Sequence, residues 1–268
     1  RADQEIPQLA ADAELKKEVV LFADTFSTWF EPENARAALK VLQAAGYTVR
    51  HAAPQENNRP LCCGRTFLAA GLVEEARSEM RRTLDALAPF ISRGVPVVGL
   101  EPSCVFTFRD EVQAILPNDD VAQKAARLCV SFEEFIARER DAGTLTLALK
   151  SGKADSIYVH GHCHQKAFGV MSAVETTLAL IPDVALHKID SSCCGMAGSF
   201  GYEAEHVEVS MQMAEASLLP AVREAPEDAI IAADGTSCRH QIADGTPREA
   251  VHVAQILAER LDTSSGQR

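Results

Sequence analysis

The tripeptide Cys-Cys-Gly occurs twice in this chain, within "LCCGRTF" at residues 61–67 and within "SSCCGMAGSFG" at residues 191–201. The two copies are separated by about half of the 268-residue chain. A motif that recurs over such a distance indicates an internal repeat of domain size. The sequence therefore predicts two copies of one structural unit, each with a cysteine pair in front of a glycine.

The segments around the two copies match in character and order. Each half begins with an apolar, strand-like run, continues through a helical stretch and a second strand, and then reaches the cysteine pair. A longer helical stretch, a strand that ends in a lone cysteine and a closing helix follow. The matching segments are 19–25 and 156–163, 32–46 and 172–182, 47–52 and 184–189, 74–94 and 205–225, 96–104 and 229–238, and 130–140 and 251–261. This alternation predicts an α/β fold made of two parallel α/β units related by a pseudo-two-fold axis.

The length of the chain allows two domains of ordinary size, and 47% of its residues are hydrophobic. The units should meet near residues 140–156, where Gly143 and Gly152 interrupt the pattern. The first residue is Arg rather than Met, which suggests a piece of a longer protein or a processed one. The expected divisions are 1–17 (a linker or leading helix), 18–140 (the N-terminal unit), 150–262 (the C-terminal unit) and 263–268 (a disordered tail).

Charge and hydropathy exclude several classes of protein. The net charge of −12, with scattered basic residues, argues against a nucleic-acid partner. No apolar run reaches the roughly 18–20 residues that a membrane-spanning helix needs. The polar residues 1–5 do not resemble a secretory signal. We expect a cytoplasmic protein without a transmembrane segment, which partners could hold at a membrane surface.

Eight cysteines require an explanation. In a chain of this length without a secretory signal, they favour metal or redox chemistry over structural disulfides. Cys129 differs from the others because it lies in the helical pattern "AARLCVSFEEF", which predicts a position in the core. The eight are Cys62, Cys63, Cys104, Cys129, Cys163, Cys193, Cys194 and Cys238.

The carboxyl ends of parallel strands meet at one edge of a sheet, where such folds bind their ligands. Superposing the repeats places Cys163 with Thr25 at these ends, and Cys238 with Cys104. The sulfurs of the second half should therefore converge on one centre. Four thiolates are the ligands of a [4Fe–4S] cluster or of a structural Zn²⁺. The predicted metal ligands are Cys163, Cys193, Cys194 and Cys238.

Glycines and histidines surround these cysteines. Gly195, Gly198 and Gly201 allow the backbone to approach the centre, and a helix that begins near Tyr202 would direct amide groups toward an anionic cluster. Nearby histidines are expected to support the ligands through hydrogen bonds, although metal ligation by one of them stays open. These are His160, His162, His164 and His240.

The second motif is also compatible with two different kinds of site. "GMAGSFG" at 195–201 could be a phosphate loop for a dinucleotide, although its glycine spacing differs from the usual one. Cys193 and Cys194 could form a disulfide with each other, or one of them could pair with Cys163 or Cys238, in a thiol–disulfide enzyme.

Three stretches, "HGHCHQKA" (160–167), "CCGMAGSFG" (193–201) and "GTSCRHQI" (235–242), resemble the cysteine-rich (CCG) domain family. That family includes the B subunit of heterodisulfide reductase and the iron–sulfur subunits of glycolate oxidase, anaerobic glycerol-3-phosphate dehydrogenase and lactate-utilisation complexes. These stretches look most like the C-terminal iron–sulfur region of FAD-linked 2-hydroxyacid dehydrogenases of the D-lactate kind. The resemblance covers roughly residues 18–262 and implies clusters, or zinc in some members, that pass electrons between a flavin and a further acceptor.

The sequence departs from the family pattern at several positions. Gln241 stands where the second half should have its last cysteine, which leaves a four-thiolate site. In the first half, Thr25 and Thr107 replace the first and last cysteines. A possible second metal site remains on Cys62, Cys63 and Cys104, with Asp24 or water as a fourth ligand; a degenerate site kept as scaffold is the alternative.

The resemblance implies an electron-transfer module that is not catalytic alone. FAD and a ferredoxin-type segment would then lie on a missing segment or on a partner, together with the flavin-containing dehydrogenase domain. Two alternatives stay open: a heterodisulfide-type reductase that acts at the paired cysteines, and a zinc-stabilised interaction module.

Overall fold

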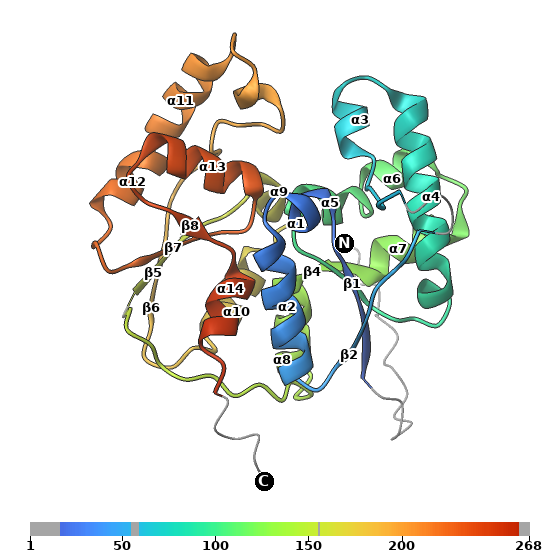
Figure 1. The fold of residues 1–268 in the computed structure, drawn as a ribbon, viewed down its shortest axis with the longest axis horizontal. Coiled ribbons are helices and arrows are strands. Elements are labelled where there is room, and N and C mark those ends of the chain that lie inside the picture. The colour runs from blue at the N-terminus through green and yellow to red at the C-terminus, as the bar shows by residue number, and fades with distance from the viewer. Residues whose placement is uncertain (1–16, 55–58, 155, 263–268) are drawn as a thin grey trace.

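The computed structural model describes residues 17–54, 59–154 and 156–262 and forms two similar α/β units (Figure 1). All of the predicted linker 1–17 except Lys17, and the whole predicted tail 263–268, lie outside the described residues. Each unit contains a four-stranded parallel sheet, in the order β2-β1-β3-β4 in the first and β6-β5-β7-β8 in the second. The identical strand order confirms the prediction of two similar parallel α/β units.

The first unit runs from Glu18 to Asp141. Its elements are β1 (Glu18–Phe22), α1 (Thr25–Trp29), α2 (Pro32–Ala44), β2 (Thr48–Arg50), α3 (Arg65–Ala69), α4 (Val73–Ile91), β3 (Val97–Gly99), α5 (Pro102–Thr107), α6 (Glu111–Ile115), α7 (Asp120–Leu128), β4 (Cys129–Ser131) and α8 (Phe132–Asp141).

The second unit runs from Ser156 to Glu259. Its elements are β5 (Ser156–His160), α9 (Cys163–Ala167), α10 (Met171–Leu178), β6 (Ala185–Lys188), the 3₁₀ turn η1 (Phe200–Tyr202), α11 (Val207–Glu215), α12 (Leu218–Glu224), β7 (Ile230–Ala233), α13 (Thr236–Gly245), β8 (Ala250–Val251) and α14 (Val253–Glu259).

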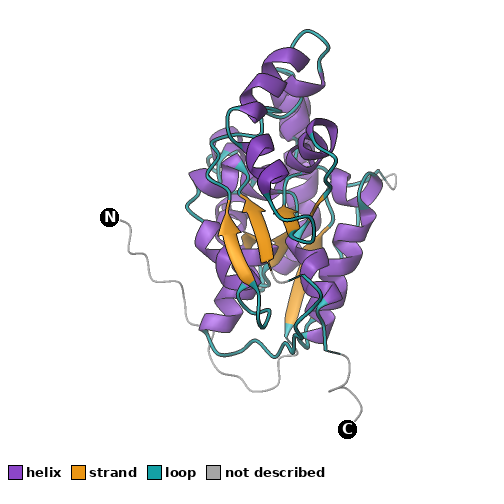
Figure 2. Ribbon diagram, turned by 90° about the vertical axis from the view of Figure 1, so that its left-hand side faces the viewer, coloured by secondary structure: helices purple, strands orange, loops and turns teal. Residues whose placement is uncertain are grey.

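Helices cover both faces of the sheets, so the central strands are apolar on both sides (Figure 2). Side chains of β1 alternate between two cores because successive residues of a strand point to opposite faces. Val19 and Leu21 enter a core that both units share, whereas Val20 and Phe22 enter a core made mostly by the first unit, to which Val170 of the second unit also belongs.

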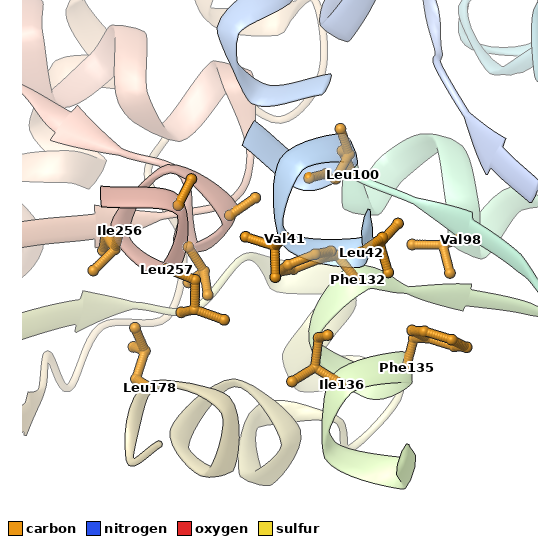
Figure 3. Packing of buried hydrophobic residues seen from close by; sticks show 14 of the residues in the cluster. Val41, Leu42, Val98, Leu100, Phe132, Phe135, Ile136, Leu178, Ile256 and Leu257 are labelled. Carbon is orange, nitrogen blue, oxygen red and sulfur yellow. The ribbon is translucent and has the colours of Figure 1, made fainter. Parts of the chain in front are cut away.

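The shared core joins the units. Helices α2 and α8 of the first unit pack against α14 and α10 of the second. Figure 3 shows Leu42, Phe132 and Ile136 facing Leu178 and Leu257 in this core. The two units are therefore held in a fixed relation by a continuous apolar interior, which is the main driving force for such association.

Two details differ from the sequence prediction. The lone cysteines do not end strands: β3 ends at Gly99 and β7 at Ala233, and Cys104 and Cys238 lie in the first turns of α5 and α13. Cys129 is buried as predicted, but it begins β4 rather than continuing a helix. A strand of three residues is too short for its periodicity to be recognised beside a helix.

Candidate metal centre

The candidate site begins where central strands pass into short helices. Three of these helices start with a side chain that accepts a hydrogen bond from the first turn. Asp24 caps α1, Glu101 caps α5 and His162 caps α9. Such caps satisfy backbone amides that would otherwise lack partners. They fix the first turns, which carry Thr25, Cys104 and Cys163.

The second unit gathers its four cysteines at this edge. Cys193 and Cys194 share a hydrogen bond, as do Cys194 and Cys238, and Cys193 influences the pKa of Cys163. Cys163 is exposed, whereas Cys194 and Cys238 are buried. All eight cysteines of the chain are free thiols. The ligand atoms of Cys194 and Cys238 lie within 4.8 Å of each other and of a ring nitrogen of His160, whereas Cys163 is grouped in the same way with His162 and His164.

The two Cys-Cys-Gly turns have the same backbone geometry. Gly195 has φ +91° and its N–H donates to Cys193 Sγ at 3.3 Å; Gly64 has φ +84° and donates to Cys62 Sγ at 3.4 Å. A Cβ at Gly195 would lie 2.1 Å from the carbonyl oxygen of Ser210. Only glycine fits this turn, because the left-handed backbone and the close approach both exclude a side chain.

Amide groups after the second cysteine pair face the sulfurs, but over a shorter stretch than predicted. The amide of Gly195 donates to Cys193 Sγ, and the amides of Ala197 and Met196 act to lower the pKa values of Cys193 and Cys194, respectively. The N–H of Gly201 instead bonds to the carbonyl of Met196.

The prediction that a helix begins near Tyr202 is wrong. Residues Phe200–Tyr202 form a 3₁₀ turn, and α11 begins only at Val207. The Tyr202 hydroxyl lies 2.7 Å from Nδ1 of His240, so this ring nitrogen of His240 already has a hydrogen-bond partner. Gly198 has φ +71° and open space around it, so it serves the turn rather than a close approach.

Lys166 is a site residue that the sequence analysis missed. Its ammonium group donates to the carbonyls of Ser191 and Ser192, directly before the cysteine pair. Burial lowers its pKa, and the charges of all four cysteines act in the opposite direction. Lys166 thus fixes the loop and supplies positive charge to the sulfurs. It lies within the motif "HGHCHQKA", but no spacing rule distinguishes it there.

The histidines have different surroundings. The Nδ1 of His162 accepts from the amide of His164 at 3.1 Å, and Nδ1 of His164 lies 3.8 Å from Cys163 Sγ. His160 is buried, with Nδ1 2.8 Å from Ser191 Oγ, and a ring nitrogen of it lies within 4.8 Å of the sulfurs of Cys194 and Cys238. Burial, together with the charge of Lys166, lowers the pKa of His160 to about 3.

The first unit repeats the arrangement with one thiol fewer. Cys62 and Cys63 share a hydrogen bond, as do Cys63 and Cys104, and the Thr25 hydroxyl bonds to Cys62. Asp24 is a poor candidate for the fourth ligand. Its carboxylate already accepts from the amides of Phe26 and Ser27 and from the Ser27 hydroxyl.

Two of the three positions at which the sequence lacks a family cysteine, Thr107 and Gln241, carry side chains that bond to their neighbours. Thr107 is buried and its hydroxyl donates to the carbonyl of Ser103 at 2.7 Å. The amide of Gln241 donates to the carbonyl and hydroxyl of Ser210, both at 3.0 Å. Both side chains are satisfied by hydrogen bonds to their neighbours.

The two units also contact each other near their cysteines. Helices α5 and α9 are in contact, and Arg65, next to the first Cys-Cys-Gly turn, affects the pKa of Cys163. Glu101 accepts from the amide of Thr236 at 2.8 Å, and Glu31 pairs with Arg239. Two carboxylates of the first unit therefore hold the start of α13, which carries Cys238.

The pKa values of Cys193 and Cys194 are raised above the ordinary value of a thiol. The hydrogen bond shared with Cys194, followed by burial, raises the pKa of Cys193. The bond from Cys193 lowers the pKa of Cys194, but the bond with Cys238 and burial outweigh it and raise this pKa to about 12. Metal binding must therefore release protons here. The donor set suits a thiophilic metal, since bound thiols are deprotonated by the metal itself.

Comparison with known proteins agrees with this geometry. The family model of the cysteine-rich (CCG) domain matches residues 157–243, which span the second unit from β5 to α13. The second unit is thus similar to the CCG domain over these residues. The match includes the four cysteines predicted as ligands.

Curated relatives are similar to both units. The C subunit of anaerobic glycerol-3-phosphate dehydrogenase from Escherichia coli (strain K12) is 29% identical over 254 residues, 94% of this chain and 61% of that protein. D-2-hydroxyglutarate dehydrogenase of the same organism is 26% identical over 96% of this chain and 24% of its own length. Lactate utilization protein A of Bacillus cereus (strain G9842) is 25% identical over 90% of this chain and 99% of that protein.

The chain is therefore similar to proteins related to oxidoreductases. The chain spans only about three fifths of the length of the glycerol-3-phosphate dehydrogenase subunit. In the described part of the chain, none of the helices has both the length and the apolar character that are needed to cross a bilayer.

Proposed function

We propose that this chain carries a thiolate-bound metal centre, a [4Fe–4S] cluster in the working protein, and relays electrons for a flavin-linked 2-hydroxyacid dehydrogenase. The observation that supports the proposal is the cluster of thiols in the second unit: Cys194 and Cys238 lie within 4.8 Å of each other, Cys193 bonds to Cys194, and the amide of Gly195 donates to Cys193 Sγ. When bound, an iron–sulfur cluster supplies one-electron transfer.

The residues of the chain hold and tune such a centre. Amide donors and the Lys166 ammonium stabilise negative charge on the sulfurs, which favours the reduced state. The oxidation of substrate belongs to a flavin-containing domain or subunit, and a ferredoxin-type iron–sulfur segment is a further partner. We place the assembly in the cytoplasm. The dehydrogenase names of the relatives support this kind of partner.

The alternative of a dithiol enzyme has less support. A nucleophilic cysteine needs a low pKa, because the thiolate is the reactive form. The pKa values of Cys193 and Cys194 are raised instead. The second alternative, a zinc-stabilised interaction module, shares the thiol donors and is distinguished by metal analysis.

The test is anaerobic purification of the full chain, followed by iron, sulfide and zinc analysis and EPR of the reduced protein. Cys194→Ser should abolish the iron–sulfur EPR signal while the helix content stays unchanged. Cys129→Ser is the matched control, because Cys129 is buried in the core of the first unit. Zinc without iron would favour the interaction module, and an unchanged signal in Cys194→Ser would refute the site.

A further inference from the structure

His160 has a ring nitrogen within 4.8 Å of two of the candidate ligands, and its Nε2 makes no hydrogen bond with a described residue. It is the last residue of β5 and only 1% exposed. Its Nδ1 contacts the Ser191 hydroxyl at 2.8 Å, whereas its buried Nε2 makes no hydrogen bond with any described residue, sulfur included. A buried polar atom without a partner is rare and unfavourable, so its position calls for a partner that is bound in the working protein.

The sulfurs of Cys194 and Cys238 indicate where a partner bound by His160 would lie. A ring nitrogen of His160 and the sulfurs of Cys194 and Cys238 all lie within 4.8 Å of one another. A tetrahedral metal with bonds of about 2.3 Å to sulfur and about 2.0–2.1 Å to nitrogen spaces its ligands by about 3.3–3.8 Å. The three atoms are thus near enough to share one metal atom after a small contraction.

The other histidines near the cysteines do not offer the same combination. His162 uses Nδ1 to cap α9, and His240 is held by the Tyr202 hydroxyl. His164 lies beside the exposed Cys163 and is itself only partly buried. Among these four, only His160 has a ring nitrogen atom that is itself fully buried and has no hydrogen-bond partner among the described residues.

We propose that Nε2 of His160 is a ligand of the metal atom that Cys194 and Cys238 bind, which makes the centre a mixed nitrogen–thiolate one. The inference rests on the proposed metal centre and specifies its donor set. Ser191 positions the ring: when Nδ1–H donates to Ser191 Oγ, the lone pair of Nε2 is directed away from that bond. A second ring hydrogen bond that fixes the tautomer is the usual arrangement of metal-binding histidines.

Imidazole ligation has a measurable consequence. Replacing thiolate by neutral imidazole removes negative charge from the centre, and histidine-ligated iron–sulfur centres have higher reduction potentials than all-thiolate ones. His160 would therefore raise the potential of an iron–sulfur centre. Its replacement by cysteine should lower that potential while it preserves metal binding.

The first test uses X-ray absorption of the zinc-loaded full chain, in a Cys62→Ser background that weakens the first-unit site. We expect a nitrogen shell at about 2.0–2.1 Å beside the sulfur shell at about 2.3 Å. His160→Gln should lose the nitrogen shell and at least tenfold in zinc affinity, and His160→Cys should keep zinc with sulfur alone. His187→Gln is the matched control, because His187 stacks on Tyr158 and is not one of the histidines near the cysteines, so this variant should keep the nitrogen shell.

The second test uses protein reconstituted with iron and sulfide after growth on ¹⁵N-histidine. A strong nitrogen hyperfine coupling should be present in the wild type and absent in His160→Gln. Sulfur-only ligation in the wild type, or an unchanged nitrogen signal in His160→Gln, overturns the assignment while it leaves the metal centre intact. A wild-type chain that binds neither zinc nor iron overturns the centre as well. Far-UV circular dichroism shows whether each variant is folded.

Discussion

Replacing Gly195 by alanine should disturb the site far more than the same change at Gly198. Both glycines have positive φ, +91° and +71°, so alanine at either position should cost about 1–2 kcal/mol of backbone strain. Only at Gly195 does the new Cβ collide, at 2.1 Å from the carbonyl oxygen of Ser210. Around Gly198 nothing lies within 4 Å of it.

The collision at Gly195 adds a second contribution to the loss of unfolding free energy. Relieving an overpacked contact of this kind costs about 1–3 kcal/mol, because the backbone must shift. We therefore expect Gly195→Ala to lose about 2–5 kcal/mol of unfolding free energy and Gly198→Ala about 1–2 kcal/mol. The shift would also withdraw the amide that donates to Cys193 Sγ at 3.3 Å, so metal content should fall only in Gly195→Ala.

Urea unfolding, followed by circular dichroism and fitted with a common slope, measures the difference between the two variants. Metal analysis of the same samples measures the effect on the site. If the two variants lose the same stability within about 0.5 kcal/mol, the difference is too small to resolve and the steric argument is refuted. Full metal occupancy in Gly195→Ala would show that the turn geometry does not position the sulfurs.

Three further predictions concern buried charges. Glu31→Ala should lower the free energy of unfolding by about 3–5 kcal/mol, because the buried Arg239 loses its carboxylate partner. In a double-mutant cycle, adding Arg239→Ala should recover part of that loss, and additive losses would refute the coupling. Burial, and then the charge of Asp234, raises the pKa of Glu133 well above its ordinary 4.5. The folded protein therefore holds a proton that the unfolded chain releases, and this contribution to stability falls as pH rises above 4.5. Glu133→Gln should flatten the decline in urea stability between pH 5 and pH 8, and an unchanged slope would contradict it. Lys166→Met should make the reduction potential of the metal centre more negative in an EPR-monitored titration, because a positive charge near the sulfurs is lost; an unchanged potential would exclude this role.

Much of the fold could be predicted because the chain repeats its own pattern. Two matching series of segments indicated two units with parallel sheets, and the structure has the same strand order in both. The errors concern short elements. The strand at Cys129 and the late start of α11 at Val207 escaped prediction, since three to five residues carry too little periodicity to separate a strand from a helix or a turn.

The sequence by itself determined which sulfurs could meet, because strand ends in a parallel sheet share one edge and the cysteines follow those ends. It also determined the two tight turns, since Gly64 and Gly195 occupy conformations that other residues disfavour. These features depend on residues that are neighbours in the chain or in the repeat.

Only the tertiary structure decided which groups are free to act. Ser191, far along the chain, bonds to Nδ1 of His160, whereas Nε2 has no partner among the described residues, and Arg239 pairs with Glu31 of the other unit. Such pairings join segments that a shared apolar core brings together, and the local periodicity of the sequence does not predict them. Hydrogen bonds and charges act over a few ångströms in space, so their partners become known only when the chain has folded.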